Sequence, residues 1–396
     1  MYDDGKTGYG ITAIAAGMDE LERRLRKGEG ELDEEGLIPI YLGRDLVRSR
    51  RYERWEQASE ELDQAAIDVA ECPLAPRRRT LEALLRSLRA AMGIFRGQRP
   101  SFADKLESLV GVPAGGADEA EMASLREEID AALTRLRIPG ASLAERVAAW
   151  RASRSLPARE LERVYGELQE EAARRTAERV YDVGGFRMRL VLRPGSSSGG
   201  RCSFDTATME INTDLGCTRS AMKHLVTHEN FPGHATQILY TRDAYLRGEA
   251  TADVLLCALN GLPGVIQEGI GDQATELIDW VEDDDDLLQI ALRRLRIAAA
   301  TTASWRLMQL GEAEAEAASY LRERGFAVDP YVDGRIAQAK HPYKGPFNAS
   351  YYFGDKAVRE VRLRAGEAGY PGFIRFLYGN IHCLPSFLEY GGAGTL

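Results

Sequence analysis

The first 180 residues place apolar side chains at intervals of three and four, which is the spacing of one face of an α-helix. Five stretches show this spacing most clearly: 20–32, 52–71, 78–95, 123–138 and 158–181. Prolines fall between them, where helices are expected to end: Pro73, Pro76, Pro100 and Pro113. The pattern predicts a helical N-terminal region over residues 1–180.

The period of the pattern changes at about residue 181. Apolar residues now alternate with arginines: Phe186, Met188, Leu190 and Leu192. A period of two is typical of a β-strand with one buried face. The segment GSSSGG, residues 195–200, indicates a flexible turn, so we predict a β-hairpin or small sheet at 184–214. Helical patterning then returns, and we expect residues 181–396 to form one continuous, mainly α fold with the N-terminal region.

Composition and charge restrict the class of protein. The 396 residues are 44% hydrophobic and 28% charged, which is typical of a soluble globular protein. A net charge of −10 argues against nucleic acid or an anionic membrane as a partner. The five cysteines are scattered and form no C-x-x-C pair, which predicts reduced thiols in a cytoplasmic protein. The sequence does not indicate an oligomeric state.

Three of the five histidines fall in one stretch, HLVTHENFPGHATQ, residues 224–237. His228 and Glu229 are adjacent, as in the H-E-x-x-H zinc motif, but the next histidine follows only after six residues. An undistorted helix would rotate His234 well away from the face of His228. Pro232 cannot continue that helix and Gly233 tolerates unusual backbone angles. We therefore predict that Pro-Gly turns His234 toward the point that His228 faces.

A catalytic zinc needs a third protein ligand, and GVIQEGIGDQATELIDW supplies a candidate in Glu268. Asp272 follows one helical turn later on the same face and can bind the outer nitrogen of a ligating histidine. An E-x-x-x-D pair after an H-E motif is similar to the two-helix site of thermolysin-like enzymes. We expect Zn²⁺ on His228, His234 and Glu268, and the same donors also suit iron or manganese.

HENFPGHATQ resembles the HExxPGHxxQ signature of the bacterial family called domain of unknown function 885, which looks like a branch of the zinc metallopeptidases. QEGIGDQATE is similar to that family's EGWALY-like segment, with Ile270 in place of the tryptophan. Two C-terminal stretches, 347–365 and 373–389, resemble further family segments, with Tyr351, Gly354 and Arg362 as matches. The likeness covers about residues 185–396.

This resemblance implies a mainly helical, zincin-like metallopeptidase architecture with Glu229 as the general base. It implies that Gln237 braces the helix or the site. Tyr351 could donate a hydrogen bond to the oxyanion formed during hydrolysis, or it could pack in the core. His341 could donate such a hydrogen bond if its loop folds over the metal, but its residue pattern favours a surface or structural role. Ile270, with the polar residues Asp272 and Gln273, departs from the family pattern, and we expect it to change the wall of the site.

The same residues allow other interpretations. His224 and His228 lie one helical turn apart, so His224, His228 and a carboxylate form a geometrically simple rival ligand set. Otherwise His224 contacts substrate or is a hydrogen-bonded helical histidine. The whole cluster could also be a set of satisfied polar residues in a helix bundle, or could bind metal without catalysis.

The function that these motifs favour is metal-assisted hydrolysis of an amide bond in a peptide or small molecule. Zinc lowers the pKa of its water toward about 7, and Glu229 would take the proton of that water and pass it to the leaving amine. An edge strand of the small sheet would hold an extended substrate. The alternatives are a non-peptidase metalloenzyme, such as an amidohydrolase, lyase or biosynthetic tailoring enzyme, and a metal-binding protein without catalysis.

Overall fold

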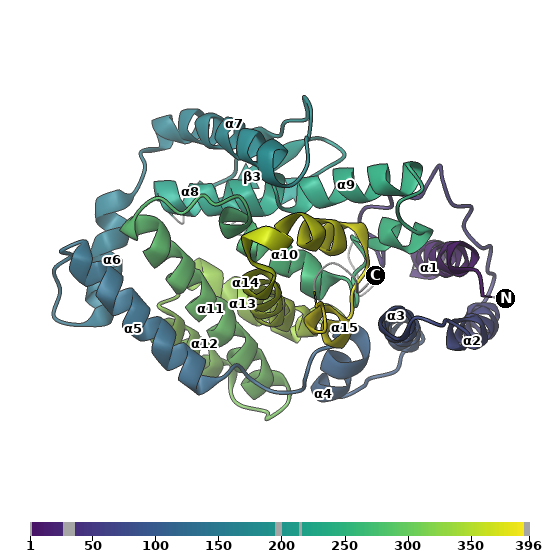
Figure 1. Cartoon of the computed structure of the whole chain (residues 1–396). Coiled ribbons are helices and arrows are strands. Elements are labelled where there is room, and N and C mark those ends of the chain that lie inside the picture. The colour runs from purple at the N-terminus through teal and green to yellow at the C-terminus, as the bar shows by residue number, and fades with distance from the viewer. Residues whose placement is uncertain (1, 27–35, 195–199, 214–215, 392–396) are drawn as a thin grey trace. The chain divides into compact units, whose positions relative to one another are not determined.

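The computed structural model describes residues 2–26, 36–194, 200–213 and 216–391, and it is mainly helical with one small three-stranded sheet (Figure 1). This confirms the predicted mainly α class. The chain forms two compact units, one of residues 1–114, 237–269 and 341–396 and one of residues 115–236 and 270–340. Each unit draws on both sides of residue 180, so the units differ from the regions 1–180 and 181–396.

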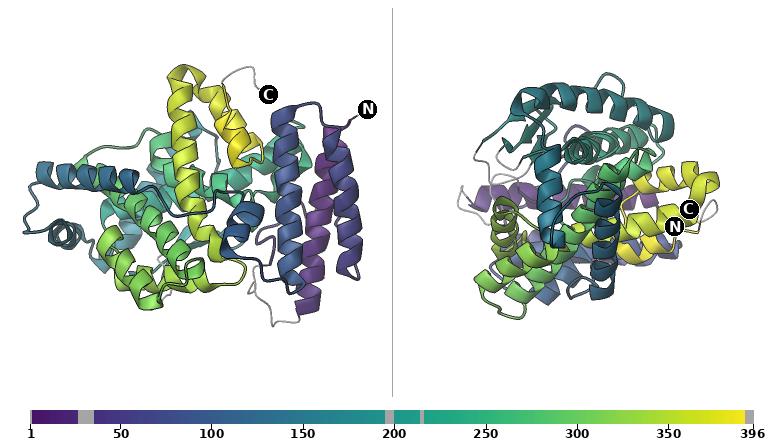
Figure 2. Two further views of the ribbon diagram at one scale, coloured as in Figure 1. Left: turned by 90° about the horizontal axis from the view of Figure 1, so that it is seen from below. Right: turned by 90° about the vertical axis from the view of Figure 1, so that its left-hand side faces the viewer.

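The first unit contains three long N-terminal helices that lie side by side, α1, α2 and α3 (Figure 2). Its elements are α1 (Asp4–Arg26), α2 (Trp55–Ala70), α3 (Ala75–Phe95), α4 (Phe102–Lys105), the π-helical turn η1 (Leu106–Val110), most of α9 (His234–Leu246), η5 (Ala252–Leu256), the start of α10 (Gly264–Leu277), η6 (Gly345–Phe347), α14 (Asn348–Gly379) and α15 (Leu384–Leu388).

Helix α3 shows how the apolar spacing produces this unit. Pro76 lies in its first turn, where a proline costs no helical hydrogen bond. Leu81, Leu84, Leu85 and Leu88 then form one buried face. Helix α1 differs from its prediction, because it begins at Asp4 and ends at Arg26, whereas the predicted stretch began at residue 20. Every residue from Ile11 to Asp19 is buried, and all of them except Thr12 and Asp19 are apolar or glycine, so this stretch lacks a one-sided pattern.

The second unit packs α5 and α12 along α11, while α7 lies along α8. Its elements are α5 (Glu119–Arg135), α6 (Leu143–Arg154), η2 (Ala158–Glu160), α7 (Leu161–Arg179), β1 (Arg189–Leu192), β2 (Gly200–Ser203), β3 (Thr208–Ile211), α8 (Arg219–Leu225), the π-helical turn η4 (Val226–Asn230), the rest of α10, α11 (Asp284–Met308), α12 (Glu314–Gly325) and α13 (Asp329–Lys340).

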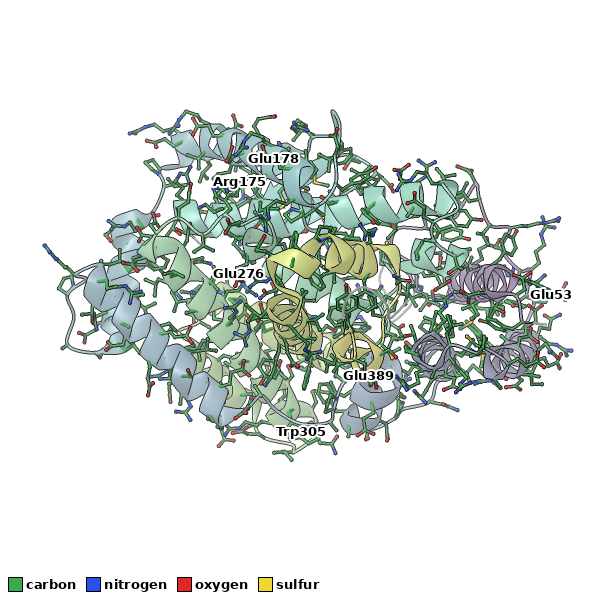
Figure 3. The ribbon with its side chains drawn as sticks, in the orientation of Figure 1. Glu53, Arg175, Glu178, Glu276, Trp305 and Glu389 are labelled. Atoms are coloured by element: carbon green, nitrogen blue, oxygen red, sulfur yellow. The ribbon has the colours of Figure 1, made fainter. Side chains whose placement is uncertain are left out.

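Two labelled side chains show how these helices are joined (Figure 3). Arg175 on α7 places its guanidinium over the ring of Trp280, 5.5 Å from the ring centroid. Glu276 on α10 forms an ion pair with Arg294 on α11 at 2.7 Å. Helix α10, which carries two predicted site residues, is thus fastened to α11.

The predicted small sheet is confirmed, with the strand order β1-β3-β2. Strands β2 and β3 form an antiparallel hairpin, and β1 pairs with β3 in parallel, with Leu190 opposite Met209. The first strand begins at Arg189, later than the alternation suggested, and Met188 just before it is buried. Residues 195–199 of the predicted turn lie outside the described residues.

Two further observations concern the predictions from composition. All five cysteines are free thiols, and Cys72, Cys217, Cys257 and Cys383 are buried. Among the described helices, none combines the length and apolar character needed to cross a membrane.

Candidate metal centre

The stretch that carries His228 is not an ordinary helix. Helix α8 ends at Leu225, and the backbone widens into the π-helical turn Val226–Asn230, in which the Phe231 N–H reaches back to the Val226 carbonyl at 3.2 Å. Such single π-turns occur frequently at functional sites. His228 is buried in this turn, while Glu229 beside it is half-buried.

The chain then leaves the helix at Phe231, which is extended, and the Phe231–Pro232 peptide bond is cis. A new helix, α9, begins at His234. Gly233 fits tightly between the two helices, because a Cβ there would lie 1.7 Å from the carbonyl oxygen of His228. The Pro-Gly corner therefore turns the chain as predicted, and the absence of a side chain at Gly233 permits the close return of the backbone.

This corner brings the two predicted histidine ligands together. The ring centroids of His228 and His234 are 4.8 Å apart, and their planes are nearly perpendicular at 89°. One donor atom from each of His228, His234 and Glu268 lies within 4.8 Å of the others. Glu268 is one turn before Asp272 on the same continuous helix, α10, so the helix itself sets its position relative to Asp272.

Asp272 lies beside the ring of His228. Its Oδ1 lies 3.1 Å from Nδ1 of His228, and both side chains are buried. A carboxylate at this nitrogen favours the tautomer with a proton on Nδ1 and makes Nε2 the coordinating nitrogen. The contact places a negative charge beside the first predicted ligand, without a hydrogen bond between the two atoms.

Arg293 on α11 was missed by the sequence reasoning. Its guanidinium lies 2.9 Å from Oδ2 of Asp272, and the arginine is buried. In the sequence Arg293 is one of several arginines in an amphipathic stretch, which gives no signal that it is buried. Arg293, Asp272 and His228 form a chain of charged and polar contacts within the second unit.

Gly271 was also missed, although its position carries a signal. A Cβ at Gly271 would lie 2.7 Å from Cε1 and Nδ1 of His228, so the imidazole packs directly on the glycine backbone. Gly269 and Gly271 are unfavourable inside a helix, and paired glycines of this kind often mark a close approach by another group. Gly269 itself faces Gly354 of α14, with its Cβ position 2.4 Å from the Gly354 carbonyl oxygen.

A buried polar network holds the π-turn against α7. The side-chain amide of Asn230 donates to Tyr165 Oη at 2.8 Å, and Tyr165 donates to the Met188 carbonyl at 3.2 Å. Gln169 receives the Met188 N–H at 2.7 Å. Burial raises the pKa of Tyr165 to about 12, so its hydroxyl stays protonated as the donor. The network fixes the turn next to Glu229.

The remaining predicted residues have the following places. Gln237 donates to the Gln267 carbonyl at 3.0 Å and so joins α9 to α10. His341 accepts the N–H groups of Tyr343 and Lys344 through Nδ1 at 3.1 and 2.9 Å, which holds its own turn. Tyr351 is half-buried on α14. The oxyanion roles of Tyr351 and His341 stay predictions.

The three residues that depart from the family pattern have different places in the fold. Ile270 and Gln273 are both completely buried. Asp272, in contrast, contacts His228 directly. The expected change in the wall of the site stays a prediction.

The rival ligand set is also present in the geometry. Donor atoms of His224, His228 and Asp272 lie within 4.8 Å of one another. His224 Nε2 is 4.0 Å from Asp272 Oδ1, and the His224 side chain is 18% exposed. Helix α8 is held in place by Lys223, whose buried ammonium group lies 2.7 Å from Glu282 and 2.5 Å from Asp286. His228 is common to this donor set and to the set of His228, His234 and Glu268.

The first donor set fits a catalytic zinc in its chemistry. Two imidazoles and one carboxylate are a common three-ligand set, and they leave a fourth position for water or substrate. A tetrahedral zinc with bonds of about 2.0–2.1 Å separates its ligand atoms by about 3.4 Å. The three donor atoms, which lie within 4.8 Å of one another, would thus close by at most about 1.4 Å on binding.

No known family model matches the chain, and no curated protein matches it. The structure is similar to a lipoprotein candidate from Colwellia psychrerythraea, with a TM-score of 0.59, 15% identity, and coverage of 93% of this chain and 68% of that chain. It is also similar to a lipoprotein candidate of unknown function from Shewanella oneidensis, with a TM-score of 0.51, 14% identity, and coverage of 84% and 72%. These likenesses show the fold alone.

Proposed function

We propose that this chain is a metal-dependent hydrolase of the zincin type that cleaves an amide bond. The observation that carries the proposal is the convergence of His228, His234 and Glu268, whose donor atoms lie within 4.8 Å of one another. The carboxylate of Asp272 at the outer nitrogen of His228 supports it, because ligating histidines are commonly held in this way.

The residues would divide the work as follows. His228, His234 and Glu268 hold the ion, and Asp272 keeps the His228 ring in one tautomer. A bound zinc supplies Lewis acidity, which polarises a carbonyl and lowers the pKa of water toward about 7. Glu229, next to His228 in the π-turn, accepts the proton of the attacking water and returns it to the nitrogen of the leaving amine, for about 10²–10⁴-fold of rate.

The edge strands of the sheet support an extended substrate. Strand β3 is central, so each of β1 and β2 pairs with one neighbour among the described strands. An edge strand can bind an extended chain through backbone hydrogen bonds. The occurrence of this sheet just before the histidine stretch in the chain favours a peptide as the first substrate class to test.

The first experiment measures metal content. The untagged protein is purified without added metal and its zinc, iron and manganese are determined, with His234→Ala as the comparison. We expect about one equivalent of metal in the parent and a large loss in the variant. Chelator treatment that removes metal without unfolding indicates an open catalytic site, whereas unfolding indicates a structural one. A parent protein that binds none of these metals contradicts the proposal.

The second experiment tests Glu229. Glu229→Gln keeps the shape of the side chain but cannot accept the proton, so it should retain the metal and lose turnover by about 10²–10⁴-fold. Glu249→Gln, a change at an exposed glutamate paired with Arg247, is the matched control and should keep full activity. Activity is followed as new amino termini from a peptide library and as hydrolysis of small amides. Parent-level turnover by Glu229→Gln would show that the base is another group.

A further inference from the structure

Two metal donor sets overlap at His228, and the structure contains a feature that distinguishes them. The first is His228, His234 and Glu268, and the second is His224, His228 and Asp272. Each offers two imidazoles and one carboxylate, so the preferences of zinc for ligand type do not separate them. The second set even has the simple one-turn spacing between His224 and His228.

The distinguishing feature is the surroundings of the Asp272 carboxylate. One oxygen, Oδ2, lies 2.9 Å from the guanidinium of Arg293, and the other, Oδ1, lies 3.1 Å from Nδ1 of His228. The side chains are strongly buried, with exposed fractions of 8% for Arg293 and 3% for Asp272. Both oxygens of the only carboxylate in the second donor set are therefore already in contact with a polar partner.

Arg293 makes the second set electrostatically unfavourable for a metal. An arginine keeps its positive charge in a protein, and burial weakens the screening of that charge by water. A divalent cation on Asp272 would be separated from the guanidinium by the carboxylate alone. Oδ1 of the same carboxylate lies beside Nδ1 of His228, where its negative charge favours a proton on Nδ1 and so Nε2 as the coordinating nitrogen.

We propose that Arg293 is a positioning residue that reserves Asp272 for His228 and thereby selects the donor set of His228, His234 and Glu268 over the set of His224, His228 and Asp272. This role of Arg293 rests on the proposed metal-dependent function, but it can be tested separately from that function. It assigns the charge of Arg293, rather than the ligands, as the reason why His224 and Asp272 do not take the ion.

The test measures Zn²⁺ affinity of the full chain by competition with a chromophoric chelator, together with the visible spectrum of the Co²⁺ form. In the parent background, His234→Ala should weaken zinc binding by about 100-fold or more, while His224→Ala should change it less than about threefold. In the Arg293→Met background, where the charge is gone, His234→Ala should bind zinc at least about tenfold more tightly than His234→Ala alone.

Two further variants confirm the origin of the regained affinity. Adding His224→Ala to the Arg293→Met, His234→Ala protein should abolish the regained binding, because the second set then lacks an imidazole. Arg293→Lys, which keeps the charge, should give no regain in the His234→Ala background. Circular dichroism verifies the fold of each variant, and Arg293→Gln replaces Arg293→Met if the latter does not fold.

The outcomes separate the two proposals. If the Arg293→Met, His234→Ala protein is folded and binds zinc no better than His234→Ala, the selector role of Arg293 is overturned while the metal site stands. If His224→Ala weakens binding in the parent as strongly as His234→Ala does, the selection itself is wrong. If the parent binds no metal, the proposed function fails first.

Discussion

Replacing Gly271 by alanine tests the local geometry of the metal centre most directly. The added Cβ would lie 2.7 Å from Cε1 and Nδ1 of His228 and 3.0 Å from its Cγ. Carbon atoms in ordinary contact are at least about 3.5 Å apart, so the ring would have to retreat by about 0.8 Å. That movement would disturb both the 3.1 Å contact with Asp272 and the position of the coordinating nitrogen.

We expect Gly271→Ala to weaken zinc binding by about 10–100-fold, the range found when the support of a metal ligand is removed. The free energy of unfolding of the metal-free protein should change less than the zinc affinity, because alanine favours a helix over glycine by about 1 kcal/mol and this partly offsets the clash. Gly264→Ala on the same helix is the control, since its Cβ would meet the Phe347 ring at an ordinary 3.8 Å.

The assay is a zinc competition titration of the parent and both variants, with urea unfolding of the metal-free proteins. We expect the parent and Gly264→Ala to bind zinc with equal affinity, and Gly271→Ala to bind it much more weakly. Equal zinc affinity of Gly271→Ala and Gly264→Ala would refute the reasoning, because it would mean that the position of the His228 ring does not control the metal.

Two further predictions concern stability. Burial lowers the pKa of the His382 imidazole to about 4 in the folded protein. In the unfolded chain the same imidazole has a pKa of about 6.5, so it takes up a proton at a higher pH than in the folded protein. The free energy of unfolding should therefore fall by about 3 kcal/mol as the pH falls from 6.5 to 4. Urea unfolding at pH 7, 6 and 5 should show a shallower loss in His382→Gln, and identical slopes would contradict this. Gly354→Ala would place a Cβ 2.0 Å from the Val265 carbonyl oxygen, so this variant should have a lower melting temperature than the parent. Gly369→Ala is the control, and its melting temperature should fall less because its Cβ meets only Ala365 at 3.6 Å. Equal melting temperatures of the two variants would show that α14 can move off α10 at little cost.

Much of the fold was predictable because its signals are local. The three- and four-residue spacing located α2, α3, α5 and α7 to within a few residues at most ends, and the period of two located the sheet. The predictions failed where no one-sided pattern exists. The stretch 11–19 of α1 is buried on all sides, and the parallel pairing of β1 with β3 depends on contacts that alternation does not encode.

The candidate site divides in the same way. His228, His234, Glu268 and Asp272 were predictable, because the H-E pair, the Pro-Gly corner and the E-x-x-x-D spacing each restrict a single stretch of backbone. The π-turn at Val226–Asn230 was not, since the same residues could continue an ordinary helix. Its conformation depends on Asn230 reaching Tyr165 and Gln169 of α7, which are more than 60 residues away in sequence.

The sequence by itself determined which side chains could bind a metal and the corner that turns His234 back toward His228. Only the tertiary structure could distinguish the two donor sets, because the selection that we propose depends on Arg293 from a separate helix, which lies 2.9 Å from Asp272. The physical reason is that ligand spacing is a property of the local backbone, whereas the electric field at a carboxylate is the sum of charges that folding brings together from distant parts of the chain.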